Sequence, residues 1–253
     1  MFNRFRKTGP LSLKKIGLLK TGSLEQIKNE IKKNHTHLTT NKGWTALHIV
    51  CRYNAKTQII IYLLKLGCSP NSQAMQDDED EWSPLHILCK YHPTPEGIET
   101  LITLGSNPNL QTKKFLLAPL HILAERIKEI ECFVALLSNG ALVNTKNKEG
   151  QTPLQIICVR RGCKDTELIK LLLQYNADPN IRDNSLRSPL HVLCRKKVTK
   201  QIVQQFLKKD AYPNAQDRFG WTPMHLLALN KDVEKGILSD LFENGGSFDL
   251  KGV

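Results

Sequence analysis

Long apolar stretches are absent from this 253-residue chain, and none approaches the roughly 18 residues that a membrane-spanning helix needs. The first 20 residues show no secretory signal pattern, because basic residues interrupt every apolar cluster. The seven cysteines form no C-x-x-C pair and no even-numbered disulfide framework, which points to a reducing compartment. We therefore expect a cytoplasmic protein, with the nucleus as the alternative location.

Catalytic signatures are missing as well. The chain contains no G-x-x-x-x-G-K-[ST], G-x-S-x-G, H-E-x-x-H or G-x-G-x-x-G motif. The acidic run 77–81 has neither the alternation nor the glycine of a calcium loop. We expect a protein without enzyme activity, cofactor or metal site.

The composition is that of a folded chain with an excess of positive charge. Hydrophobic residues make up 40% and charged residues 24%, which are ordinary globular values. Thirty-six lysines and arginines against 24 aspartates and glutamates give a net charge of +12. Such an excess attracts acidic partners.

The chain repeats itself. "SPLHILCK" at 83–90 and "SPLHVLCR" at 188–195 are two of six related motifs, whose starts are separated by 38, 35, 34, 36 and 34 residues. The other four are "TALHIVCR", "APLHILAE", "TPLQIICV" and "TPMHLLAL". A second motif, such as "LGCSPN" at 66–71 or "YNADPN" at 175–180, follows each copy in step. Two motifs at a fixed offset indicate one supersecondary unit stacked repeatedly.

Each unit is predicted to contain two antiparallel helices. The motif opens mostly with a hydroxyl residue and a proline, which suit a helix N-cap and first turn. A second run with helical spacing, such as "ELIKLLLQYN" at 167–176, mostly ends at Gly or Asn, a common left-handed helix stop. From Leu13 the chain follows the same pattern, and Ser23-x-x-Gln26 forms a capping box, so we expect an N-terminal helical cap.

These motifs resemble those of ankyrin-repeat proteins, and "TPLH"-type text with "ADPN" at 177–180 carries the resemblance. It implies an all-α repeat solenoid of stacked antiparallel helix pairs with β-turn or hairpin fingers, whose inner helices line a concave binding face. The expected boundaries are a basic leader at 1–12 and a single domain at 13–253. The domain comprises a cap (13–39) and repeats at 40–77, 78–112, 113–146, 147–182, 183–216 and 217–250. Ala46, Ala118 and Gln155 depart from the motif and are expected to weaken individual fingers only.

The histidines and cysteines of the motif are expected to be structural. His48, His86, His121, His191 and His225 occupy the position whose imidazole bonds the neighbouring hydroxyl and backbone in the family. Cys51, Cys89, Cys158 and Cys194 share one register, where two other repeats have alanine, so we interpret them as small core residues.

Function is then expected on the surface, at two sets of aligned positions. The first, the tryptophan column, immediately precedes each motif and comprises Trp44, Trp82, Leu117, Gln151, Arg187 and Trp221. This column is exposed in the family, and Trp is enriched in binding hot spots, although packing of the indoles on adjacent fingers is the alternative. Phe115 and Phe219 add apolar side chains near it.

The second set, the cation column, lies where the inner helices end and comprises Arg52, Lys90, Arg126, Arg160, Arg195 and Lys196. Binding of an acidic partner is one reading. The other is that these cations only complement the helix dipoles.

We expect a monomeric scaffold or adaptor that binds an acidic or acidic–aromatic segment of another protein. Binding of phosphate-rich ligands, either nucleic acid or anionic lipid, is the alternative, and it predicts affinity that falls steeply with salt. A targeting or membrane-surface role of the basic leader is a lesser alternative. Asn180 also resembles the asparagines that asparaginyl hydroxylase modifies in ankyrin repeats, so its hydroxylation is a further hypothesis.

Overall fold

The computed structural model describes residues 11–32, 37–75, 80–126, 129–161, 165–196, 198–230 and 233–247. Most of the expected basic leader, residues 1–10, lies outside the described residues. Within the described part, no helix is long and apolar enough to cross a membrane.

The described residues form fourteen short helices and one two-stranded sheet, which confirms the predicted all-α repeat solenoid. The inner helices are α1 (Leu13–Thr21), α3 (Ala46–Tyr53), α5 (Pro84–Tyr91), α7 (Pro119–Arg126), α9 (Pro153–Arg161), α11 (Pro189–Cys194) and α13 (Pro223–Ala228). The outer helices are α2 (Leu24–Glu30), α4 (Thr57–Lys65), α6 (Pro95–Thr103), α8 (Ile130–Ser138), α10 (Thr166–Gln174), α12 (Lys200–Leu207) and α14 (Ile237–Glu243). The strands β1 (Ala74–Met75) and β2 (Glu81–Trp82) pair antiparallel, with Ala74 opposite Trp82.

The chain divides into two compact units. Unit 1 spans Met1–Leu123 and Glu131–Ala141, and unit 2 spans Ala124–Ile130 and Leu142–Val253. The expected single domain over residues 13–253 stays a prediction beside this division.

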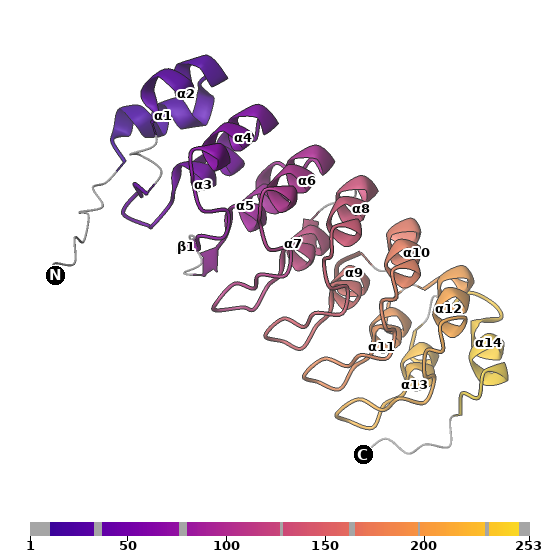
Figure 1. Ribbon diagram of the computed structural model, residues 1–253. Helices are drawn as coiled ribbons and strands as arrows, with labels where there is room; N and C mark the ends of the chain where they lie inside the picture. Colours follow the sequence, from indigo (N-terminus) through magenta and orange to yellow (C-terminus); the bar gives the residue numbers. More distant parts are fainter. Residues whose placement is uncertain are drawn as a thin grey trace. The chain divides into compact units, whose positions relative to one another are not determined.

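Neighbouring helix pairs pack side by side within each unit (Figure 1). In unit 1, α3 packs between α1 and α5, and α4 packs between α2 and α6. In unit 2, α11 packs between α9 and α13, and α12 packs between α10 and α14. An inner helix therefore has neighbours on several sides, and residues 46–51 of α3 and 84–89 of α5 are all buried. An outer helix buries one face only, as Ile59, Ile60 and Leu63 do in α4.

The inner helices begin as their sequences predict. In α3 the Thr45 hydroxyl bonds the amide and the ring of His48, and Ser83 and His86 repeat this capping box in α5. The far nitrogen of each ring bonds the next repeat: His48 Nε2 lies 3.0 Å from the carbonyl oxygen of Trp82, and His86 Nε2 lies 2.8 Å from that of Leu117. His48 and His86 thus each cap their own helix and also bond the following finger.

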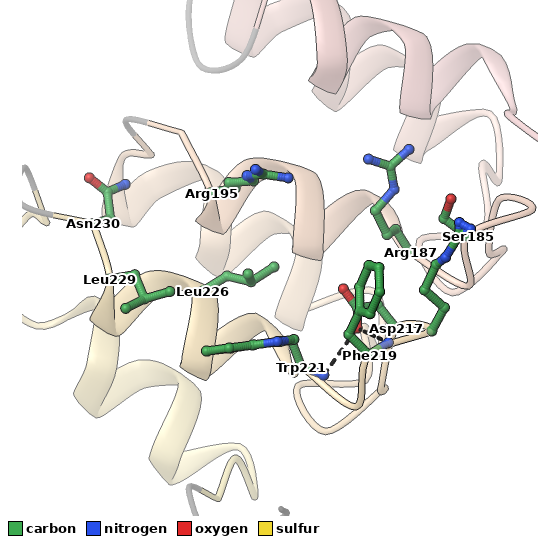
Figure 2. A pocket seen from close by; sticks show the side chains of 10 residues that line it. Ser185, Arg187, Arg195, Asp217, Phe219, Trp221, Leu226, Leu229 and Asn230 are labelled. Atoms are coloured by element: carbon green, nitrogen blue, oxygen red, sulfur yellow. Dashed lines mark hydrogen bonds between the residues drawn. The ribbon is translucent and has the colours of Figure 1, made fainter. Parts of the chain in front are cut away.

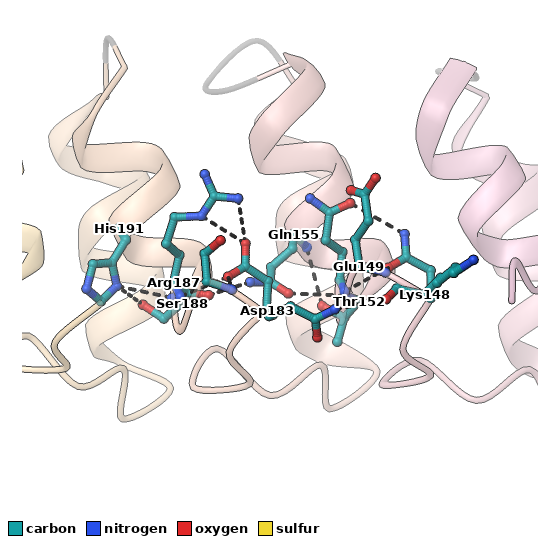
Figure 3. Close-up of polar contacts among 12 residues, drawn as sticks. Lys148, Glu149, Thr152, Gln155, Asp183, Arg187, Ser188 and His191 are labelled. Carbon is teal, nitrogen blue, oxygen red and sulfur yellow. Dashed lines mark hydrogen bonds and ion pairs between the residues drawn. The ribbon is translucent and has the colours of Figure 1, made fainter. Parts of the chain in front are cut away.

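The departures from the motif keep this architecture. Gln155 replaces the histidine and makes equivalent bonds, because its Oε1 accepts from Thr152 N at 3.2 Å and its Nε2 donates to the Arg187 carbonyl at 2.7 Å (Figure 3). At Ala118 the backbone N–H still donates to His121 Nδ1 at 3.0 Å, but alanine supplies no cap hydroxyl. The expectation that such changes spare the fold is consistent with these contacts.

A second ladder joins the turns that follow the outer helices. The carboxamide of Asn71 donates to the Gly105 carbonyl at 2.8 Å and accepts from Asn107 N at 2.8 Å. Asn109, Asn144, Asn180 and Asn214 donate in the same way to a carbonyl in the following turn, at 2.6 to 3.1 Å. We call these five side chains the asparagine ladder, which explains why the second sequence motif so often ends in Asn.

Candidate functional site

Three of the six residues of the tryptophan column are buried, contrary to expectation. Trp82 is 2% exposed, Trp44 is 8% exposed and its indole N–H donates to the Met75 carbonyl at 2.7 Å. Leu117 is also buried, and its carbonyl accepts the bond from His86. The prediction that these three side chains are exposed is therefore wrong. At these positions the alternative, packing against the adjacent finger, agrees with the structure.

The cation column explains part of this burial. In unit 1 the Arg52 guanidinium lies 5.2 Å from the centre of the Trp44 ring, and the Lys90 ammonium lies 4.2 Å from the centre of the Trp82 ring. Each cation comes eight residues after its tryptophan, near the end of the helix that the tryptophan precedes. Long helical side chains lean toward the helix N-terminus, so these cations reach back over the indoles. In unit 1 the two sequence columns therefore contact each other at these two positions.

Trp221 in unit 2 differs from the other tryptophans. Eight residues after it stands Leu229 instead of a cation, and Leu229 is itself 66% exposed. Trp221 is 36% exposed, and no cation lies over its ring among the contacts of the described residues. Phe219, on the same finger, is 59% exposed. The predicted exposure is thus confirmed at Phe219 and Trp221.

A pocket of about 490 Å³ opens beside Trp221. Figure 2 shows Arg187 from one finger, Arg195 at the end of α11, and Phe219 and Trp221 from the next finger facing it. Its remaining lining residues are Ser185, Asp217, Arg218, Leu226, Leu229 and Asn230. We call it the arginine pocket. It brings together four residues that the sequence singled out: Arg187, Arg195, Phe219 and Trp221.

The three arginines of the pocket differ in their contacts. Arg187 donates twice to Oδ2 of the buried Asp183, at 2.9 and 2.7 Å, which fixes its guanidinium (Figure 3). Arg218 lies 5.4 Å from the centre of the Phe219 ring. Arg195 and Arg218 are exposed and form no ion pair within the described part of the chain.

The single acid of the pocket is engaged by its own finger. Oδ1 of Asp217 accepts the backbone N–H groups of Phe219 at 2.8 Å and of Trp221 at 3.0 Å (Figure 2). These bonds shape the finger that carries both aromatic side chains. The lining holds three arginines and one aspartate, and Asp183 pairs with Arg187, so the pocket together with this ion-pair partner has a formal charge of +1.

The other predicted cations do not join this pocket. Arg126 is exposed at the end of α7, and Arg160 pairs with Glu125 at 3.7 Å. The Lys196 ammonium donates to the Val159 carbonyl. Arg52 lines a smaller pocket of about 210 Å³ in unit 1, together with Trp44, Lys20, Lys42 and Tyr53.

The finger at 113–117 exposes apolar side chains, as the sequence suggested for Phe115. Phe115 and Leu116 are exposed, and the Lys114 ammonium lies 5.3 Å from the centre of the Phe115 ring. Leu116 has a φ of +53° and Leu186 a φ of +61°, where the corresponding fingers have Gly43, Gly150 and Gly220. Leucine is unfavourable in this left-handed region, so both fingers contain local strain.

Asn180, the candidate for hydroxylation, belongs to the asparagine ladder. Its Nδ2 donates to the Asp210 carbonyl at 2.8 Å, and its Oδ1 accepts from Tyr212 N at 2.7 Å. A modifying enzyme has to open these bonds to reach the side chain. Hydroxylation stays a prediction, which mass spectrometry of the peptide around Asn180 tests.

The buried histidines and cysteines have the properties of core residues. Burial lowers the pKa of His48 to about 4 and that of His86 to about 4, so both rings are neutral at neutral pH. Burial raises the pKa of the Cys68 thiol to about 12 and also raises those of Cys51 and Cys89 well above the usual thiol range. No group of three or more metal-ligating side chains occurs in the described ranges.

The sequence alone did not reveal Arg218, Leu226, Leu229 or Asn230 as pocket residues. One signal was present, because Leu229 breaks the pattern of a cation after each motif. The role of the asparagine ladder was also missed, although asparagine ends the second motif in five of its six copies.

Comparisons with known proteins agree with this architecture. The family model for ankyrin repeats matches the chain in three overlapping copies, over residues 18–112, 88–183 and 120–217. An ankyrin repeat protein of fowlpox virus (strain NVSL), FPV024, is 38% identical over 74 residues. This stretch covers 29% of the chain and 12% of the viral protein, so the chain matches only a small part of that relative.

Proposed function

Because the chain belongs to the ankyrin-repeat family, whose repeats generally mediate protein–protein interaction and are typically non-enzymatic, we propose that it is a scaffold or adaptor that binds an acidic–aromatic segment of a partner protein. The arginine pocket in unit 2 is the proposed principal contact. Within unit 2, the exposed cations Arg126, Arg160 and Lys196 are proposed to lengthen the surface.

One observation carries this proposal: the arginine pocket combines cations without acidic partners and an uncovered indole. Arg195 and Arg218 form no ion pair within the described residues, and Trp221 and Phe219 are the exposed aromatic side chains beside them. Arginine forks bind carboxylates through two parallel bonds, and an exposed Trp buries much area at little entropic cost.

The apolar part of the pocket supports a mixed acidic and aromatic segment over a purely acidic one. Leu226 and Leu229 line the pocket beside Trp221. A purely acidic segment would leave this apolar surface in water, whereas an aromatic or large aliphatic residue would cover it. The acidic residues of the same segment would then meet Arg195 and Arg218.

A peptide-display selection against the intact chain tests the proposal. We expect enrichment of peptides in which acidic residues flank an aromatic or leucine residue. Replacing both Arg195 and Arg218 by glutamine should weaken the binding of these peptides by about tenfold or more. Trp221→Ala should weaken binding by a similar factor.

A matched pair of surface lysines provides the control. Lys208 and Lys209 lie at the end of α12, are exposed and do not line the pocket. Replacing both by glutamine removes the same charge and should leave peptide affinity within about twofold. Selected peptides without acidic residues, or equal losses in the two double variants, would contradict the proposal.

The net charge of +12 supports a second candidate function, binding of nucleic acid or anionic lipid. Such binding falls steeply with salt, by about a thousandfold or more between 50 and 200 mM for six or more phosphate contacts. A salt titration with single-stranded DNA and with phosphatidylserine vesicles separates this candidate from peptide binding. We expect only weak, salt-sensitive association with both probes.

A further inference from the structure

We propose that the arginine pocket recognises phosphotyrosine in its partner segment, an inference that rests on the proposed function and specifies the chemistry of the same site.

Two arginines of the pocket can both meet a phosphate dianion. Asp183 neutralises Arg187, whereas Arg195 and Arg218 form no ion pair within the described residues. A phosphotyrosine carries a charge between about −1.5 and −2 at neutral pH, whereas a glutamate side chain carries one negative charge. A carboxylate could neutralise only one of the two guanidinium groups of Arg195 and Arg218, whereas a phosphate dianion can neutralise both.

The arginines also differ in how far they are available. Arg187 is held in place by both its bonds to Asp183, so its position is fixed before a ligand arrives. Arg195 and Arg218 form no ion pair within the described residues, so a ligand does not have to displace a carboxylate from either. Paired arginine forks are the usual protein ligands of a phosphate group.

The exposed indole of Trp221 favours phosphotyrosine over phosphoserine. Trp44 and Trp82 in unit 1 lie beneath cations of the chain itself, whereas Trp221 has Leu229 at the corresponding position. The indole of Trp221 is therefore open to a ring from outside, with Leu226 and Leu229 beside it. A phosphotyrosine can pack its ring against the indole of Trp221 and bind the arginines through its phosphate. A phosphoserine has only the phosphate.

Four degenerate peptide pools test the proposal against the intact chain. Each pool has random acidic-rich flanks and one fixed central residue, namely phosphotyrosine, phosphoserine, tyrosine or glutamate. Fluorescence anisotropy should show that the phosphotyrosine pool binds about tenfold or more tightly than each of the other three. Phenyl phosphate should displace it at lower concentration than inorganic phosphate, because only the former carries a ring.

Variants of the chain assign the effect to the pocket. Replacing both Arg195 and Arg218 by glutamine should remove the advantage of phosphotyrosine over tyrosine, and Trp221→Ala should remove its advantage over phosphoserine. The double replacement of Lys208 and Lys209 by glutamine should keep both advantages. Circular dichroism should be used to verify that each variant retains its helices.

The outcomes separate this inference from the proposed function. If the glutamate pool binds as tightly as the phosphotyrosine pool and loses affinity in the arginine variant, phosphotyrosine recognition is overturned and acidic-segment binding stands. If no pool responds to the arginine variant, both are overturned. Equal binding of the phosphoserine and phosphotyrosine pools would also overturn the inference.

Discussion

The buried histidines of unit 1 should make its stability sensitive to acid, and a natural variation within the chain shows how to remove that sensitivity. His48 and His86 accept a backbone N–H at Nδ1 and face a carbonyl with Nε2, so each ring is neutral when the protein is folded. Gln155 makes the corresponding bonds with an amide that does not titrate. We therefore predict that replacing both histidines by glutamine keeps the fold and removes their contribution to acid unfolding.

The size of the effect follows from the pKa values. An unfolded histidine titrates near 6.5, and burial lowers the pKa of each folded ring to about 4. Because the folded pKa is depressed, the unfolded state takes up protons first as the pH falls below 6.5. Stability is fully present above that pH and is lost progressively down to about pH 4. At pH 5 the loss is about 2 kcal/mol for each histidine, or about 4 kcal/mol together.

Urea denaturation followed by circular dichroism at pH 7.5, 6.5, 5.5 and 5.0 measures this loss. Carboxylates contribute to acid unfolding in both proteins, so the difference between the parent and the double variant isolates the two rings. We expect the parent to lose about 4 kcal/mol more than the variant between pH 7.5 and 5.0. The reciprocal change Gln155→His should add acid sensitivity to unit 2, because it puts a titratable ring where the amide of Gln155 is buried. Parallel stability curves for parent and double variant would refute the reasoning.

Three further predictions concern single sites. Ala118→Ser should restore the missing cap hydroxyl, which Ser83 supplies in α5, and raise the free energy of unfolding by about 1 kcal/mol in urea titrations. If the free energy of unfolding does not rise, the buried site cannot accept the hydroxyl. Trp82→Ala should lower the free energy of unfolding by about 3 to 5 kcal/mol because Trp82 is buried, whereas Trp221→Ala should lower it by about 1 kcal/mol or less. Equal destabilisation of the two variants in thermal unfolding would contradict the assignment of Trp221 to the surface. Leu186→Gly should raise the free energy of unfolding by about 1 kcal/mol, because glycine adopts the positive φ of this residue without strain. Leu186→Ala keeps the strain and should not raise it, so an equal gain in both variants would contradict the assignment of strain to Leu186.

The helices and their caps were predictable because they depend on local chemistry. A hydroxyl residue, a proline and a histidine three residues later are sufficient to start α5 and α11, and Ser23 and Gln26 start α2 as expected. The burial of His48, His86, His121 and His191 agrees with the structural role predicted for the motif histidines, while His225 keeps its cap bond but is only half-buried.

The exposure of the tryptophan column was not predictable from the column alone. The cover of an indole comes partly from the adjacent finger and partly from the side chain eight residues later, which is Arg52 for Trp44 and Leu229 for Trp221. The arginine pocket could not be predicted from the sequence for a related reason. Its lining combines two successive fingers with the ends of two inner helices, and only the stacking of the repeats brings Arg187 near Phe219.

The asparagine ladder has a consequence for how order spreads along unit 2. Asn214 donates to the Gly245 carbonyl and accepts from Ser247 N, so a side chain from one repeat closes the turn of the next. Folding of the last repeat is thereby coupled to that of its predecessor, as expected for a nearest-neighbour array. A ligand held between the fingers that carry Arg187 and Trp221 clamps the same two repeats together. Its binding should therefore slow amide hydrogen exchange as far as Gly245, well away from the residues that it touches.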